Sequence, residues 1–262
     1  MKAETVDEHI NLGNMQFALG NYQGAIATFS EAIRLDPYSA GAYNNRGIVK
    51  SELGDYQGAL ADYNQAITCK PDYAQAYGNR GNVKSALGDY QGALADYNQA
   101  ITLDPNCTEA YIGRGILKNE LGDTQGALAD FDQAIGIKPD YALAYYSRGL
   151  AKDLSGDNQG ALADFNEAIR LQPSDYKSYN NRGVVKYNSG DKQGAIADYN
   201  QALLLQPHFA DAYNNRGVAK AGLGDIQGAI SDLQEAVKIY QMQGDIERYN
   251  NALDSLREIR KL

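Results

Sequence analysis

The chain has 262 residues, a formal net charge of −9 and 44% hydrophobic residues. Because nucleic-acid binding needs a basic face, this acidity argues against a nucleic-acid partner. No apolar run is long enough to cross a membrane and no signal peptide is evident, so we expect a cytoplasmic protein that is not an integral membrane protein. The two cysteines, Cys69 and Cys107, fall in unlike places and do not indicate a disulfide framework.

Proline marks a repeat along almost the whole chain. Successive prolines are 34 residues apart, at Pro37, Pro71, Pro105, Pro139, Pro173 and Pro207. A fixed period of this length is typical of a repeat array, in which each repeat contacts only its neighbours. After an N-terminal lead (residues 1–5), we expect seven repeats, at residues 6–39, 40–73, 74–107, 108–141, 142–175, 176–209 and 210–243.

Each repeat contains the pattern of two helices joined by a tight turn. In the second repeat the first helix is expected over residues 41–53 and the second over residues 56–69. Gly54 is expected to end the first helix and Asp55 to cap the second, and Pro71 stops the second helix. Because a helix hairpin cannot bury its apolar face alone, we expect the repeats to stack.

Glycine holds the eighth place of every repeat, inside the first predicted helix. These glycines are Gly13, Gly47, Gly81, Gly115, Gly149, Gly183 and Gly217. Glycine within a helix costs roughly 0.5–1 kcal/mol relative to alanine, so its recurrence needs a local reason. The second helix offers small residues at Ala59 and Ala66 and a large one at Tyr63. We therefore expect the two helices of each hairpin to approach closely at the glycine.

This pattern resembles the tetratricopeptide repeat (TPR) family. The second repeat carries the family signature as Tyr43, Gly47, Ala59, Tyr63, Ala66 and Pro71. The resemblance covers residues 6–243, and it departs from the commonest pattern where arginine, such as Arg46, replaces the leucine before the glycine. The resemblance implies an all-α fold, a right-handed TPR superhelix (an α-solenoid of helix hairpins) whose first helices line a concave groove.

The sequence leaves the repeat in the C-terminal segment, residues 244–262, where residues 245–262 have the pattern of one amphipathic helix. Its apolar stripe is Ile246, Tyr249, Leu253, Leu256 and Ile259. We expect a C-terminal capping helix that covers the exposed end of the seventh repeat. An alternative is a docking helix for a partner or for a second copy of the chain.

Three charged residues recur together in repeats two to seven and are all missing from the first repeat. They are Arg46, Lys50 and Asp62 in the second repeat, and Arg182, Lys186 and Asp198 in the sixth. The arginine and the lysine are four residues apart, so they share one helix face. We interpret the set as a structural ion-pair ladder between helices or adjacent repeats. The alternative is a basic stripe that faces a ligand.

Side-chain amides recur on the face of the first helix that is opposite its apolar residues. They are Asn11, Asn45, Asn79, Asn181 and Asn215 at the sixth place, with Asn44, Asn180 and Asn214 beside them. A carboxamide can donate to a carbonyl and accept from an N–H, which matches an extended peptide backbone. We expect these residues to line a peptide-binding groove. The alternative is that they bridge neighbouring repeats.

Apolar residues also occur on this nominally exposed face, mainly in the middle repeats. Those we expect in the groove are Ile48, Ile112, Ile116, Tyr146, Leu150 and Tyr187. Their functional interpretation is a pocket for apolar side chains of a bound segment. The alternative is that curvature of the array buries them.

No group of residues in the sequence predicts catalysis. His9 and His208 lie at opposite ends of the array, and there is no phosphate-binding loop, zinc-type cysteine pair or local nucleophile motif. We therefore expect no enzymatic activity, no metal and no cofactor. The family resemblance implies a non-catalytic scaffold, adaptor or assembly factor that binds a protein or peptide in the concave groove. An alternative is a self-associating array, a homo-oligomer with the groove or the capping helix as its interface.

Overall fold

The computed structural model describes residues 5–261, so most of the N-terminal lead lies outside the described residues. Over that range the chain forms α-helices and no β-strand, which confirms the predicted all-α fold of helix hairpins. None of the described helices is long and apolar enough to span a membrane. The helices fall into two compact units, which divide after Ile137.

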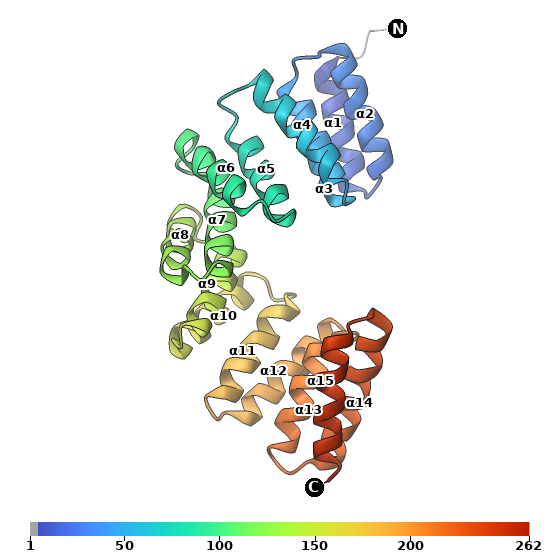
Figure 1. Cartoon of the computed structure of the whole chain (residues 1–262), viewed down its shortest axis with the longest axis vertical. Helices are drawn as coiled ribbons and strands as arrows, with labels where there is room; N and C mark the ends of the chain where they lie inside the picture. The colour runs from blue at the N-terminus through green and yellow to red at the C-terminus, as the bar shows by residue number, and fades with distance from the viewer. Residues whose placement is uncertain (1–4, 262) are drawn as a thin grey trace. The chain divides into compact units, whose positions relative to one another are not determined.

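The described helices of the N-terminal unit pair into consecutive hairpins (Figure 1). Its helices are α1 (Val6–Ala18), α2 (Tyr22–Leu35), α3 (Ala40–Glu52), α4 (Tyr56–Cys69), α5 (Ala74–Ala86), α6 (Tyr90–Leu103), α7 (Thr108–Glu120) and α8 (Thr124–Ile137). Each odd-numbered helix packs against the even-numbered helix that follows it, and α1, α3, α5 and α7 also contact one another in sequence. The first helices of the hairpins therefore form a continuous face of this unit.

The C-terminal unit contains three hairpins and a final helix. Its helices are α9 (Ala142–Leu154), α10 (Asn158–Leu171), α11 (Tyr176–Asn188), α12 (Lys192–Leu205), α13 (Ala210–Ala221), α14 (Ile226–Gln243) and α15 (Ile246–Ile259). The first helices α9, α11 and α13 contact one another in sequence, and α15 packs on α14 and α13.

The turn inside a hairpin follows from a glycine and an aspartate, as predicted. Gly54 lies between α3 and α4 with a φ of +79°, in the left-handed region that favours glycine. Asp55 then caps α4, where its Oδ1 accepts a hydrogen bond of 2.9 Å from the backbone N–H of Gly58. This cap satisfies one of the backbone donors that a helix start leaves free.

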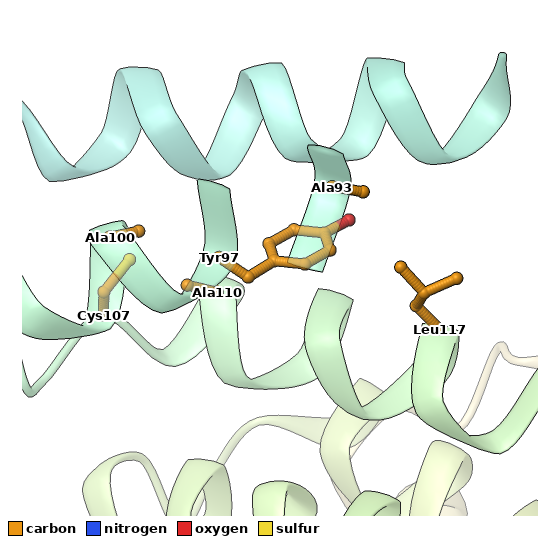
Figure 2. Close-up of a cluster of buried hydrophobic side chains, with 6 residues drawn as sticks. All are labelled: Ala93, Tyr97, Ala100, Cys107, Ala110 and Leu117. Atoms are coloured by element: carbon orange, nitrogen blue, oxygen red, sulfur yellow. The ribbon is translucent and has the colours of Figure 1, made fainter. Parts of the chain in front are cut away.

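Close approach at the eighth-place glycine allows a large ring to fill each hairpin. A Cβ added at Gly47 would lie 2.7 Å from Cε1 of Tyr63, a distance that real Cβ atoms do not show. Figure 2 shows the equivalent ring of Tyr97 in the next hairpin, lying among alanines and Leu117. Tyr97 is 2% exposed. Within each unit the core therefore consists of small clusters, such as the one that α6 of this hairpin forms with α7 of the next.

The final helix α15 covers one face of the last hairpin. Leu256 and Ile259 are buried in a cluster with Ala229 and Leu233 of α14. The predicted apolar stripe is wrong for Ile246, which is 73% exposed. Ile246 is the first residue of α15 and lies outside the clusters that the helix forms with α14.

Candidate functional site

The recurring arginine, lysine and aspartate form an ion triad in each of repeats two to seven. In the second repeat, Arg46 Nη2 lies 2.6 Å from Asp62 Oδ1, and Lys50 Nζ lies 2.8 Å from Asp62 Oδ2. The equivalent aspartates are Asp96, Asp130, Asp164, Asp198 and Asp232. Asp62 is 3% exposed, so both cations satisfy a carboxylate inside the hairpin.

The arginine of the triad also reaches the preceding hairpin. Nη1 of Arg46 donates to Ser30 Oγ of α2 at 2.9 Å, and Nη1 of Arg80 donates to Asn64 Oδ1 of α4 at 2.7 Å. The hydrogen bond to the Asp62 carboxylate raises the pKa of Arg46. One guanidinium thus joins the second helices of two consecutive hairpins. This geometry favours a structural ladder over a basic stripe that faces a ligand.

The asparagines of the N-terminal unit bridge consecutive hairpins. Nδ2 of Asn45 donates to Asn14 Oδ1 at 3.0 Å, and Nδ2 of Asn79 donates to Asn44 Oδ1 at 3.0 Å. Asn44 is only 4% exposed, and its role as a groove contact stays a prediction. Its fifth place in the helix turns toward α5, which contacts α3. Asn45 and Asn79 remain partly exposed, and Asn11 on α1 is exposed.

A similar row of hydrogen bonds runs along the C-terminal unit. Nδ2 of Asn181 donates to the hydroxyl of Tyr146 at 3.0 Å, and Nδ2 of Asn215 donates to Asn180 Oδ1 at 3.2 Å. Nδ2 of Asn214 donates to Asn215 Oδ1 at 3.5 Å. Asn180 is 6% exposed, and its role as a groove contact likewise stays a prediction. Burial raises the pKa of Tyr146, whose ring packs on Phe165.

The predicted apolar contacts are less exposed than the helix period indicates. Ile112 is 3% exposed and holds the same fifth place as Asn44 and Asn180, and its role as a contact residue stays a prediction. The other partly buried residues pack against core clusters of their own units, namely Ile48, Tyr146, Leu150 and Tyr187. Ile116 is 38% exposed.

Two hollows lie on the first-helix face of the N-terminal unit. One has a volume of about 400 Å³ and is lined by Asn44, Ile48, Tyr73, Gln75, Gly78, Asn79, Asn82, Cys107 and Glu109. The other has a volume of about 360 Å³ and is lined by Asn82, Ser85, Ala86, Tyr90, Tyr97, Gly113, Ile116 and Glu120. Because Asn82 of α5 lines both, we call the pair the α5 groove.

Two glycines shape the α5 groove. A Cβ at Gly113 would lie 2.6 Å from Cε1 of Tyr97, whose hydroxyl donates to Asn82 Oδ1 at 2.7 Å. This contact explains why the row of amides is interrupted at Gly113. A Cβ at Gly78, in contrast, would meet no atom within 4 Å. The space beside Gly78 is therefore open to an incoming side chain.

Some lining residues were not among the predicted contacts, notably Tyr73 and Cys107. Both hold the N-cap place of a first helix without making a capping hydrogen bond, whereas Ser39 and Asp175 do cap their helices there. An aromatic residue or cysteine where a capping side chain is expected was the available signal. Burial raises the pKa of the Cys107 thiol. Over residues 5–261, no three His, Cys, Asp or Glu side chains are grouped to hold a metal ion.

Comparison with protein families finds one kind of repeat along the chain. A family model described as "TPR repeat" matches residues 13–54, 50–88, 117–152 and 186–224. Models described as "Tetratricopeptide repeat" match residues 74–107, 146–203 and 209–242. Comparison with curated proteins finds no significant match.

Solved structures share the fold. A tetratricopeptide repeat protein from Parabacteroides merdae is 23% identical, with a TM-score of 0.70 over 95% of this chain and 98% of that one. MamA is 25% identical, with a TM-score of 0.57 over 66% of this chain and 95% of that one. YrrB, a TPR protein with an unusual peptide-binding site, is 22% identical, with a TM-score of 0.53 over 70% of this chain and 95% of that one.

Proposed function

The chain belongs to the tetratricopeptide repeat family, and we propose that it is a non-catalytic scaffold that holds a peptide segment of a partner protein in the α5 groove. The observation that carries this proposal is the pair of adjoining hollows on the first-helix face of the N-terminal unit. Their lining combines carboxamides with apolar side chains, which is the composition that an extended peptide needs.

The chemistry of the lining supports a peptide as the occupant. Gln75, Asn79 and Asn82 offer carboxamide donors and acceptors to a peptide backbone, and each bond contributes about 0.5–1.5 kcal/mol net. Ile48 and Tyr73 offer apolar surface beside them. YrrB, which shares the fold, has a peptide-binding site. The partner is therefore a protein, and the net charge of −9 disfavours nucleic acid.

The role that follows is an adaptor or assembly factor. The two cysteines are free, which fits a reducing, cytoplasmic compartment. The proposal includes no metal, cofactor or reaction, because burial raises the pKa of Cys107, the thiol in the groove lining, and so disfavours the thiolate that a nucleophile needs.

Filling the groove is expected to abolish peptide binding without unfolding the chain. Gly78→Leu places a side chain in open space and removes a helical glycine, so the melting temperature should hold or rise. Peptides selected from a displayed random library with the wild-type chain should bind this variant at least about tenfold more weakly in fluorescence polarisation.

The matched control is Gly136→Leu in α8, where an added Cβ also meets no atom within 4 Å and which lies outside the groove. This control should bind like the wild type. Equal binding by wild type and Gly78→Leu would move the site away from the α5 groove. Selection of no peptide by the wild type would refute the proposed function.

The C-terminal end favours self-association as a second candidate. A hollow of about 260 Å³ lies between α14 and α15, lined by Tyr240, Gln241, Gly244, Asp245, Ile246, Tyr249 and Asn250. Ile246, which lines it, is 73% exposed. If this surface joins two copies, light scattering should show a molar mass that rises with protein concentration. The Ile246→Ser variant should have the mass of a monomer at every concentration. A monomer at every concentration would remove this candidate.

A further inference from the structure

We infer that the segment held in the α5 groove is basic, a peptide with lysine or arginine next to an apolar side chain. The inference rests on the proposed function, because it names the chemistry of the peptide in that groove. The inference follows from two observations. The basic residues of the first helices lie in ion triads outside the groove lining, whereas two glutamates lie in the lining.

The ion triads hold the basic side chains of α3, α5 and α7, which line the groove together with α6. The arginines and lysines of α3, α5 and α7 are Arg46, Lys50, Arg80, Lys84, Arg114 and Lys118. Each of them pairs at 2.6–2.8 Å with a buried aspartate on the second helix of its own hairpin. None of the six lines either hollow. Each triad still holds two cations against one carboxylate, but its basic groups are directed into the hairpin and not into the lining of the hollows.

The acidic residues at the groove keep their charge unpaired. Glu109 lines the first hollow and Glu120 lines the second, and both are exposed. Among residues 5–261, neither side chain has a hydrogen bond or an ion pair. The lining therefore contains two carboxylates and no basic residue, although Nζ of the exposed Lys70 lies 5.2 Å from the centroid of the Tyr73 ring. With two carboxylates and this one cation, the groove keeps a negative potential that attracts a cation.

The charge of the whole unit reinforces this local field. Residues 1–137 contain 17 acidic and 9 basic residues, whereas residues 138–262 contain 16 and 15. Nearly all of the net charge of −9 therefore belongs to the unit that carries the groove. An acidic peptide would be repelled by it, and a basic peptide would be steered toward it.

The apolar lining lies beside each carboxylate. Tyr73 and Ile48 share the first hollow with Glu109, and Ile116 shares the second with Glu120. Lysine and arginine carry an apolar stem below the charged head, so such a surface suits them and an apolar neighbour in the peptide. A lysine or arginine of the bound peptide would therefore place its charge next to the carboxylate of Glu109 in the first hollow or of Glu120 in the second.

The test begins with a random peptide library displayed on phage and selected with the wild-type chain. Selected peptides should be enriched in lysine and arginine. Synthetic copies should bind Glu109→Gln/Glu120→Gln more weakly, by about two- to five-fold for each carboxylate, because exposed ion pairs are weak. Raising the salt from about 0.1 M to about 1 M, where the Debye length falls from about 10 Å to about 3 Å, should weaken wild-type binding in the same direction.

A control with the same change in charge is Asp140→Asn/Glu247→Gln, two exposed residues of the C-terminal unit without a side-chain partner in the described chain. It should bind the peptides like the wild type. The selected peptides could lose affinity for Gly78→Leu without being enriched in lysine or arginine. That result would overturn the inference and leave the proposed function standing. Basic peptides that bind the control and the glutamine variant equally weakly would also overturn it, since net charge alone would then explain binding. Selection of no peptide would overturn both.

Discussion

Asp62→Ala is expected to lower the free energy of unfolding by about 3–5 kcal/mol, because it leaves two cations without their carboxylate. Asp62 is 3% exposed and pairs with both Arg46 and Lys50. The side chains of the two cations are only 18% and 20% exposed, so water does not fully replace the lost partner. The freed arginine also bonds Ser30 of the preceding hairpin, and the loss should therefore extend beyond one repeat.

Urea unfolding followed by circular dichroism measures this loss. Asp198→Ala in the C-terminal unit should behave alike, because Asp198 pairs with Lys186 at 2.8 Å and with Arg182. Asp72→Ala is the control, since Asp72 is exposed in an inter-repeat turn and should change stability by less than about 0.5 kcal/mol. Unchanged unfolding of Asp62→Ala would show that the triads are not structural.

The sequence was sufficient to predict the hairpins, because their causes are local and repeated. Gly54 and Asp55 specify a turn and a helix cap from two adjacent residues. Arg46, Lys50 and Asp62 have equivalents in every repeat from the third to the seventh and none in the first repeat. This joint occurrence indicated that the three residues lie close together. The reach of Arg46 to Ser30 was not predictable, since it depends on how two hairpins stack.

Exposure along the first helices could not be predicted from the helix period. The period places the fifth residue of each first helix on the outer side, yet Asn44 and Asn180 are buried where consecutive first helices contact one another. Ile112 holds the same place and is also buried. The α5 groove depends instead on Gly78 and on turn residues such as Tyr73, whose convergence only the packed hairpins reveal.

Replacing a helical glycine by alanine is expected to have a large effect on stability. The substitution should destabilise the chain at one place in α3 and stabilise it at another. Gly47→Ala should destabilise the chain by about 1–3 kcal/mol, because its Cβ would lie 2.7 Å from the Tyr63 ring. That ring is 2% exposed and packs with Ala59 and Val83, so it has little room to move. Gly41→Ala in the same helix meets no atom within 4 Å and should stabilise by up to about 1 kcal/mol.

Thermal unfolding separates the two glycine variants, since each kcal/mol moves the melting temperature by about 2–4 °C in a chain of this size. Gly217→Ala adds a comparison, because its Cβ would meet Cγ of Leu233 at 2.9 Å instead of a ring. Leu233 is 0% exposed and the backbone oxygen of Ala229 lies 3.2 Å from the same Cβ, so Gly217→Ala should also destabilise the chain. Equal stability of Gly47→Ala and Gly41→Ala would contradict this prediction. It would mean that the close approach of the two helices does not require glycine at the eighth place.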